Sequence, residues 1–391
     1  MSFINKNKHF SDLISEELKK RGFKEGDENE KKLFYCDITY GKRKNPSYFK
    51  CEIVNQLSNV KLLGNKKDQY QNHLNYYQTR PDYLPFTISF NLDTQDLVND
   101  LFMQNPRESP KVFIIKPEND SFRKGVGIVR NRMEFQSHLN KYPKYYNWII
   151  QDYIDDPLLI NRRKFHLRIY VIYMQTPEYQ VAYLSRNGFM YTANKEFEKG
   201  VFDEDVVLSG ENAPINVFYL PEDFQKEFGK NIWENVVWNQ LVKITRETIK
   251  STLDYLQCPS ENQKCFKILG YDILIDKNFK CYLAEINARS VTFKYPNEKF
   301  KSSFYKNILE MVLAPEPLSN DELKKKGIPY QRILYKSNGI VSEGFNGIIR
   351  QSQILMQEGI ESNRKFDRWY WNLFFPFLIL ILIVITFQVR K

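Results

Sequence analysis

The stretch that most constrains the fold spans residues 267–288, KILGYDILIDKNFKCYLAEINA. Two runs rich in β-branched and aromatic residues flank a polar turn, a pattern that predicts a β-hairpin. If Asp276 pairs with Cys281, four residues close the hairpin, which is a common loop length. The same register sets Asp272 opposite Glu285 on the paired strands.

The hairpin is also a candidate metal site. Side chains alternate along a strand, so Asn287 shares a face with Glu285, and Asp272 lies opposite. Two carboxylates and an amide oxygen then converge on one patch, an all-oxygen set suited to a Mg²⁺ ion that also carries phosphates. A hairpin whose polar face simply meets water would show the same pattern, and the spacing alone leaves both interpretations open.

Composition sets the scale of the protein and narrows its partners. With 391 residues and 42% hydrophobic content, the chain can bury a large core, in two or three subdomains. Its net charge of +10 favours a nucleic acid, an anionic membrane or an acidic protein as partner, although lysine-rich surfaces often serve only solubility. The cysteines are scattered without a CxxC pair, which predicts a reduced domain facing the cytosol. They are Cys36, Cys51, Cys258, Cys265 and Cys281.

The C-terminal segment differs from the rest of the chain. Residues 373–387, LFFPFLILILIVITF, are uncharged and would span roughly 22 Å as a helix. Counting residues 369–389 lengthens the helix to roughly 31 Å, with aromatic residues at interfacial depth. Pro376 falls in the first turns, where a proline costs least. We expect a single-pass tail anchor over residues 369–389; a buried terminal helix is the alternative, but it would need covering on all sides.

Candidate phosphate-binding residues begin with a short strand. Residues 112–117, VFIIKP, form a buried-strand pattern that ends in Lys116, a cation that could face phosphates in a cleft. After it, Lys124, Gly125 and Gly127 lie in a loop whose backbone N–H groups could cover phosphates. Most two-glycine loops are ordinary hairpin turns, and the GxxxxGK[ST] pattern of a Walker loop is absent.

Two further strands carry candidate binding residues. Residues 148–154, WIIQDYI, are typical of a buried strand whose polar exit could offer backbone groups to an adenine edge. Residues 164–173, KFHLRIYVIY, alternate between an apolar face and a polar one. The polar face carries Lys164, His166, Arg168 and Tyr170. Neighbouring cations on a strand are costly unless an anion meets them, so this face predicts an anion site; a solvated outer face is the alternative.

Other elements follow from periodicity and turn signals. We expect helices over residues 10–21, 66–77, 93–103 and, for the most part, 221–256. We expect strands over residues 34–38 and 49–54, and a hairpin of residues 180–185 with 189–193.

Five blocks, taken in order, carry a family resemblance: VFIIKP, KGVGI, WIIQDYIDDPLLI, RKFHLRIYV and GYDILID…YLAEINA. Their order and spacing resemble the tubulin–tyrosine-ligase-like family, which are ATP-grasp amino-acid ligases acting on tubulin tails. The resemblance implies an α/β (α+β) fold with a two-lobed, ATP-grasp-like nucleotide site. On this basis we expect an N-terminal lobe (1–105), a ligase core (106–313), a stalk (314–368) and a transmembrane tail anchor (369–389). Two apolar patches of the stalk, 331–335 and 354–356, could dock back on the core.

The resemblance also implies roles for individual residues. The implied catalytic residues are Lys116, Lys164 and Arg168, which would face phosphates or the acyl intermediate. The implied ATP-binding residues are Lys116, Lys124, Gly125, Gly127, Gln151, Asp152, Tyr153, Ile154, Lys164 and His166. The implied magnesium ligands are Asp272, Glu285 and Asn287, which the hairpin register brings together independently.

The chain departs from the family pattern at several positions. His166 stands where the family usually has an aspartate, and a neutral imidazole is a poorer acceptor than a carboxylate. Tyr191 stands where an arginine follows the turn, although Arg186 is near in sequence. Residues 207–210, VLSG, replace an HLTN block. The magnesium and phosphate positions are intact.

Two functions of different class follow from these observations. The first is an ATP-dependent ligase that adds glutamate, glycine or tyrosine to tubulin, microtubules or a similar acidic protein through an acyl phosphate. The second is a nucleotide-binding pseudoenzyme that tethers such a partner to a membrane. The acidic tails of tubulin would suit a basic chain, and no nucleic-acid partner is expected.

Overall fold

Two long antiparallel strands, β10 (Arg163–Gln175) and β14 (Lys264–Ile275), form the centre of the fold. The structure, a computed structural model, describes residues 2–5, 11–26, 33–37, 51–102, 111–118, 124–209, 217–288 and 298–337. All of these lie in one unit that spans Met1–Asn338. The register of the central pair sets Arg168 directly opposite Asp272.

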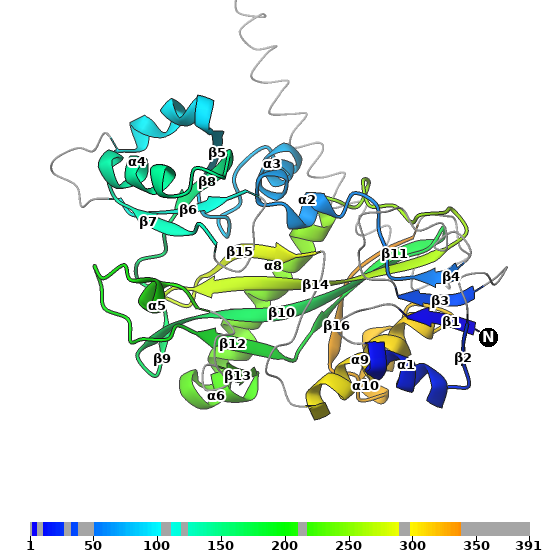
Figure 1. The fold of residues 1–391 in the computed structure, drawn as a ribbon. Coiled ribbons are helices and arrows are strands. Elements are labelled where there is room, and N and C mark those ends of the chain that lie inside the picture. The colour runs from blue at the N-terminus through cyan, green and yellow to red at the C-terminus, as the bar shows by residue number, and fades with distance from the viewer. Residues whose placement is uncertain are drawn as a thin grey trace, which may run out of the picture. The chain divides into compact units, whose positions relative to one another are not determined.

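Twelve strands of the described residues join this sheet (Figure 1). Its main path runs through β13 (Val217–Leu220), β12 (Gly188–Thr192), β10, β14, β4 (Cys51–Val54), β3 (Leu33–Asp37), β1 (Ser2–Asn5) and β2 (Lys24–Glu25). The others are β9 (Leu159–Ile160), β11 (Tyr179–Ser185), β15 (Cys281–Asn287) and β16 (Tyr330–Ser337). β11 and β9 pair with β10, β15 pairs with β14, and β16 pairs with β11.

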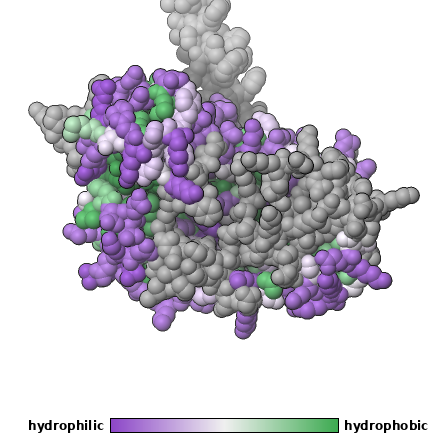
Figure 2. All heavy atoms as spheres, in the orientation of Figure 1, coloured by the Kyte–Doolittle hydropathy of each residue, from purple (hydrophilic) through white to green (hydrophobic). Residues whose placement is uncertain are grey.

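A second, four-stranded sheet forms a small lobe above β14 and β15 in Figure 1. Its order is β5 (Thr87–Asn91), β8 (Asn147–Asp152), β6 (Phe113–Pro117) and β7 (Gly127–Val129). The helix α4 (Arg132–Lys141) and the 3-10 segment η2 (Leu92–Phe102) supply Phe135, Leu139 and Val98 to its core. In Figure 2 the visible surface of this lobe is mostly hydrophilic, with small hydrophobic areas between polar side chains.

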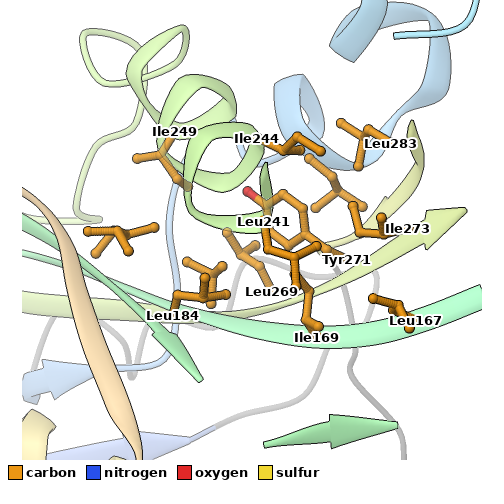
Figure 3. Packing of buried hydrophobic residues seen from close by; sticks show 14 of the residues in the cluster. Leu167, Ile169, Leu184, Leu241, Ile244, Ile249, Leu269, Tyr271, Ile273 and Leu283 are labelled. Carbon is orange, nitrogen blue, oxygen red and sulfur yellow. The ribbon is translucent and has the colours of Figure 1, made fainter. Parts of the chain in front are cut away.

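Helices cover both faces of the large sheet. One face packs against α8 (Trp238–Lys250), whose Leu241, Ile244 and Ile249 meet strand residues such as Leu167 and Tyr271 (Figure 3). The apolar residues of α8 recur at helical spacing, so burial of this one stripe stabilises the helix. The second face packs against α9 (Glu298–Leu313), α1 (Ser11–Lys20) and α10 (Asn320–Lys325).

Shorter helices complete the fold. Before α8 lie α6 (Glu222–Phe228), α7 (Lys230–Ile232) and the π-helical turn η4 (Trp233–Val237). The remaining helices are α2 (Lys61–Gly64), α3 (Lys66–Tyr77) and α5 (Glu204–Val207). The predicted helix over residues 66–77 is confirmed, and the one over 10–21 corresponds to α1. The predicted helix over 93–103 has 3-10 geometry.

The predicted hairpin of residues 180–185 with 189–193 is wrong. β11 and β12 both pair with β10, β11 along its second half and β12 along its first. The two strands therefore follow one another along β10 instead of pairing together. The cause is the length of β10, which at 13 residues offers an edge to both.

The predicted polar face of β10 is shorter than the alternation suggested. Tyr170 is fully buried in the second core and contacts the ring of Phe304 at 5.0 Å between centroids. Both faces of β10 are covered beyond Arg168 because α9 packs over the second half of the strand.

Two predicted domain boundaries also differ from the structure. Residues 1–105 do not form a lobe of their own, because β4 pairs with β14 while β5 belongs to the small sheet. The stalk cannot begin at residue 314, because β16 is hydrogen-bonded to β11 along its length. The patch at residues 331–335 lies within β16 and docks on the core, which the sequence had left open.

The prediction of reduced cysteines is wrong. Cys258 and Cys265 form a disulfide, and their Cα atoms lie 5.6 Å apart. Cys51 is also disulfide-bonded. Of the cysteines whose side chains the structure describes, Cys281 alone has a free thiol. The connection from α8 folds back to the start of β14, which brings Cys258 beside Cys265 without a CxxC spacing.

Among the described helices, none combines the length and apolarity needed to cross a bilayer. The expected anchor at residues 369–389 lies outside the described residues, as does the patch at 354–356.

Candidate functional site

The hairpin of β14 and β15 sets the predicted metal residues on one face. Asp272 pairs with Glu285, as predicted, and Gly270 pairs with Asn287. The turn differs by one residue from the prediction, because Cys281 pairs with Ile275. A β-bulge between Asp272 and Ile273 in the ladder restores the expected pair.

The bulge decides which way Glu285 points. Cys281 and Leu283 face the core, and strict alternation would bury Glu285 beside them. Ala284 and Glu285 are instead both partly exposed, and Ile286 returns to the core. The bulge therefore turns Glu285 and Asn287 onto the face that carries Asp272.

Asp272 is held by three neighbours. Arg168 donates from Nε to Oδ1 at 2.5 Å and from Nη2 to Oδ2 at 3.1 Å. The Asn287 amide donates to Oδ2 at 3.1 Å, and Nε2 of His166 lies 3.7 Å from Oδ1. Burial raises the pKa of Asp272, but the charges of Arg168 and then His166 more than offset this, so its pKa is lowered. Asp272 is therefore an anion at neutral pH.

Arg168 is the matching cation. Burial lowers the pKa of Arg168, but the Asp272 carboxylate outweighs burial and holds that pKa well above its ordinary value. A bidentate pair of this kind fixes both side chains in one geometry.

Glu285 meets a cation from a different part of the chain. Nζ of Lys66, the first residue of α3, lies 3.4 Å from Oε1 of Glu285. The preceding residue, Asn65, caps α3 by accepting from the backbone N–H of Asp68 and also donates to Glu118 at 3.2 Å. The cap thus fixes the start of α3 beside the hairpin.

Lys116 lies within electrostatic reach of the carboxylates, and Lys164 lies within electrostatic reach of Lys116. Lys116 is on β6, and its Nζ donates to the side-chain oxygen of Gln151 at 3.0 Å. The pKa of Lys116 is lowered to about 8, because burial and then the charge of Lys66 outweigh the opposite effect of Glu285 and Asp272. These couplings place Lys116 within electrostatic reach of both carboxylates.

Lys164 is the more buried of the two lysines, with 3% of its surface exposed. Its Nζ lies 4.0 Å from the ring centroid of Tyr153. Burial lowers its pKa to about 7, and the charge of Lys116 adds to this effect. A buried ammonium without a carboxylate within ion-pair distance, among the described residues, is costly unless an anion joins it.

The predicted glycine loop enters β7. Gly125 has a φ of +71°, a conformation that glycine adopts readily, and Gly127 pairs with Ile115 of β6. Lys124 is exposed at the start of the described part of this loop.

The predicted adenine hinge lies at the end of β8. The backbone N–H of Asp152 donates to Phe86 at 2.9 Å, and that of Tyr153 donates to Val112 at 3.1 Å. Gln151 donates to the Thr87 hydroxyl at 2.9 Å. Burial raises the pKa of the Asp152 carboxyl. The internal hydrogen bonds of this segment make it rigid up to Ile154, the residue at which it leaves the small lobe.

The departures from the family pattern lie beside one another. Nδ1 of His166 lies 2.7 Å from the hydroxyl of Ser209, which belongs to the segment that replaces the HLTN block. The ring of Tyr191 lies 5.4 Å from that of His166, and the Arg168 guanidinium lies 5.7 Å from the Tyr191 centroid. Arg186 is elsewhere, since it pairs with Glu234 at 3.0 Å.

The structure thus brings together most of the predicted site. Sequence reasoning missed Lys66 as a partner of Glu285 and Ser209 as a partner of His166. The sequence had identified Lys66 only as the start of a predicted helix. The serine had no signal, because the contact joins residues 43 positions apart.

The residues present fit Mg²⁺ and a nucleotide. Asp272, Glu285 and Asn287 offer only oxygen ligands, the donor type that magnesium prefers. No group of three or more His, Cys, Asp and Glu side chains arranged for a metal occurs among the described residues. Magnesium usually completes its coordination with water and substrate phosphates, and the buried Lys164 offers a counter-charge for such phosphates.

Comparison with known proteins identifies the family of this chain. Residues 42–209 and 221–325, well over half of the chain, match the Tubulin-tyrosine ligase family. The chain is 25% identical over 293 residues to a probable alpha-tubulin polyglutamylase, Ttll1, of Tetrahymena thermophila, covering 67% of this chain and 66% of that protein.

Two other relatives are longer. Tubulin glycylase 3D of Tetrahymena thermophila is 24% identical over 377 residues, covering 88% of this chain and 34% of that protein. Tubulin polyglutamylase TTLL7 of Homo sapiens is 25% identical over 370 residues, covering 84% of this chain and 40% of that protein. The chain thus spans between about a third and two thirds of the length of these relatives. On the extent of the family match, this chain belongs to the tubulin-tyrosine ligase family.

Proposed function

We propose that this chain is an ATP-dependent ligase that joins an amino acid to a carboxylate of tubulin or a similar acidic protein. The observation that carries the proposal is the position of Lys116, which lies within electrostatic reach of the paired Asp272 and Glu285 and also of the buried Lys164. Cations and carboxylates on facing elements are what a metal-bound triphosphate needs. The names of the relatives, tubulin polyglutamylases and a glycylase, support the substrate class.

ATP would bind between the small lobe and the β14–β15 hairpin. Lys116 and Lys164 would neutralise its phosphates, and the backbone of residues 124–128 would lie over them. The backbone at Ile154, just beyond β8, would meet the adenine edge, since the N–H groups of Asp152 and Tyr153 are already used.

Magnesium would be held by Asp272, Glu285 and Asn287. When bound, the ion would neutralise charge on the phosphates and orient the transferring group. Lys66 holds the carboxylate of Glu285 in place, and Arg168 holds that of Asp272. To bind the ion, Asp272 would have to coordinate it with oxygen atoms that also accept hydrogen bonds from Arg168.

ATP is a substrate of the proposed reaction. An oxygen of the acceptor carboxylate attacks the γ-phosphorus atom, the bond to the β–γ bridging oxygen breaks, and ADP leaves. The amine nitrogen of the amino acid then attacks the acyl carbon, the carbon–oxygen bond to phosphate breaks, and the amine loses a proton. The products are an amide, ADP and phosphate. Positioning and charge neutralisation account for most of the catalysis in such a transfer.

The His166–Tyr191 side of the site favours a second candidate. At the positions where the family carries a carboxylate and a cation, this chain has an imidazole and a phenol in contact. A chain that binds Mg-ATP but lacks these groups would act as a nucleotide-binding tether for an acidic partner. Ser209 would then serve only to hold His166.

Labelled amino-acid incorporation distinguishes the two candidates. The full chain is incubated with Mg-ATP, tubulin and labelled glutamate, glycine or tyrosine, and both ADP and labelled tubulin are measured. We expect one amino acid to be incorporated with one ADP released per amide. Tubulin lacking its acidic tails serves as the substrate control and should not be labelled.

A Glu285→Gln variant serves as the matched protein control, because Glu285 is partly exposed and pairs with Lys66, so its replacement leaves the core intact. Mg-ATP binding without incorporation of any amino acid would favour the tether. Absence of Mg-ATP binding would exclude both candidates.

A further inference from the structure

One histidine of the small lobe lies against the glycine loop and plays no part in the proposed chemistry. His138 is in the last turn of α4, and its Nε2 lies 2.9 Å from the carbonyl oxygen of Gly125. A carbonyl oxygen only accepts, so Nε2 carries the proton and donates it. The imidazole therefore ties the loop to a rigid helix of the same lobe.

The second glycine of the loop fits against the same ring. A methyl group on Gly127 would overlap the His138 imidazole, so only a glycine lets the backbone lie this close. The first glycine is enclosed in a similar way, because a methyl group on Gly125 would lie 2.8 Å from both Pro117 and Tyr145. Two aromatic side chains thus set the position of the loop.

The ring of His138 is itself fixed on one side. It contacts Trp148 of β8 edge-on, with 5.6 Å between centroids, and Tyr142 at 5.0 Å. On another side it borders a cavity of about 150 Å³ whose further wall includes Phe202 and Glu204. The cavity gives a different side chain room to occupy position 138 without repacking the lobe.

We propose that His138 is a positioning residue that sets where the backbone of residues 124–128 lies over the phosphates. The inference rests on the proposed function, since it assigns a role within the nucleotide site. His138 acts through Gly125 and Gly127 and touches no phosphate itself. Its loss should weaken ATP binding more than it slows the chemical step, because the lysines and carboxylates stay in place.

The test uses the full chain with four variants of the contact and one control variant. His138→Ala removes the ring, and His138→Gln keeps an N–H donor of similar reach. Gly127→Ala keeps the histidine at position 138, but the added methyl group displaces its ring. This variant therefore probes the contact between His138 and the loop even if His138→Ala fails to fold. The double variant, Gly127→Ala with His138→Ala, tests whether the added methyl fits the space that the ring vacates. Met133→Ala, on the exposed side of the same helix at 81% exposure, is the matched control.

Three measurements are made on each variant. They are the Kd for Mg-ATP, the KM values for ATP and for the amino acid, and the hydrogen-exchange rates of the backbone amides of residues 124–128. Loss of one hydrogen bond predicts a rise of about fivefold in Kd and KM for ATP with His138→Ala. We expect kcat and the KM for the amino acid to stay within about twofold and the loop amides to exchange about tenfold faster.

The conservative variants sharpen the result. His138→Gln should recover most of the affinity, and the double variant should be less impaired than the product of its single changes predicts. The proposal is overturned if His138→Ala binds Mg-ATP like the wild type with unchanged exchange, or if it raises every KM alike. If the wild type itself fails to bind Mg-ATP, the proposed function fails, and the nucleotide role of His138 fails with it. Faster exchange in His138→Ala would then establish only that the ring holds the loop.

Discussion

Asp272 and Glu285 meet because two neighbouring strands pair in a defined register, whereas His166 and Ser209 meet because a distant segment folds back over a strand. We call the first region, with Asn287, the hairpin end of the site, and the second region, with Tyr191, the loop end. Backbone hydrogen bonds position every side chain of the hairpin end. At the loop end, the register of β10 with β12 pairs His166 with Tyr191, and a side-chain contact joins Ser209 to them.

The difference shows where the site tolerates change. Strand pairing brings fixed positions together whatever side chains they carry. The hairpin end therefore forms a ligand set whenever these positions carry the correct residue types. At the loop end, each replacement alters a contact, and His166 has acquired a serine as its partner. The hairpin end should therefore carry the larger functional effects.

The largest effect is expected from the hairpin carboxylates. Glu285→Gln and Asp272→Asn should each lower amino-acid incorporation by about a thousandfold, since both remove a negative metal ligand. Their stabilities should differ, because Asp272→Asn leaves Arg168 buried without its carboxylate and costs about 3 kcal/mol. Glu285→Gln breaks a pair with only Lys66 and should cost less than about 1 kcal/mol.

Incorporation assays and urea unfolding measure these two quantities. A Glu285→Gln variant with more than about a tenth of wild-type incorporation would contradict the importance of the hairpin end.

The second effect concerns Lys164, a buried cation within electrostatic reach of Lys116. Lys164→Met should weaken Mg-ATP binding by about a hundredfold, because a buried phosphate counter-charge is lost. Its pKa is about 7 in the folded chain and 10.5 ordinarily, so between these values the unfolded chain binds a proton that the folded chain does not. The unfolding free energy should therefore rise with pH from about 7 to 10 in the wild type, and less steeply in the variant.

Lys264→Met is the matched control for this prediction. Burial lowers the pKa of Lys264 to about 8, but its Nζ donates to Ala314 beside α9, away from the site. Lys264→Met should likewise make the unfolding free energy rise less steeply with pH, and it should leave Mg-ATP binding unchanged. Equal binding losses in the two variants would mean that buried lysines affect nucleotide binding only through stability.

A smaller effect is expected from His166→Ala at the loop end. The change removes the contact with Ser209 and the ring contact with Tyr191, and kcat/KM for incorporation should fall by about tenfold. The steady-state rate with each labelled amino acid provides the measurement. A loss as large as that of Glu285→Gln would show that the loop end is as critical as the hairpin end.

The smallest effect is expected from Ser209→Ala, which removes one hydrogen bond and should lower kcat/KM by about threefold. The double variant with His166→Ala should be no worse than His166→Ala alone, because the serine acts through the histidine. Additive losses in this double-mutant cycle would mean that Ser209 has a contact of its own with substrate.

Local sequence patterns predicted the pair at the hairpin end, although the turn is one residue longer than predicted and an unpredicted bulge restores the pair. Asp272 and Glu285 could be paired from the sequence because only a short turn separates their strands. The buried strands carrying Lys116 and Arg168 also had clear patterns. The family resemblance then joined elements that are far apart in the chain.

The rest depended on long-range packing. The alternation of β10 predicted a polar Tyr170, but α9, which lies far along the chain, covers that face. The pairing of β16 with β11 and the Cys258–Cys265 disulfide likewise arise from how segments return to the sheet. The residue types of a segment do not indicate which distant strand or cysteine it will meet when the chain returns to the sheet.

The bulge in β15 has a consequence for how this site could tolerate a deletion. Ala284 is one extra residue, and it is what shifts the inside-outside rhythm of the strand before Glu285. Removing that alanine would let the strand resume its rhythm from Cys281 with every backbone rung still made. Glu285 would then follow Leu283 directly and stay on the ligand face with Asn287, so a single deleted codon could leave a folded protein that keeps its ligand set in a regular ladder.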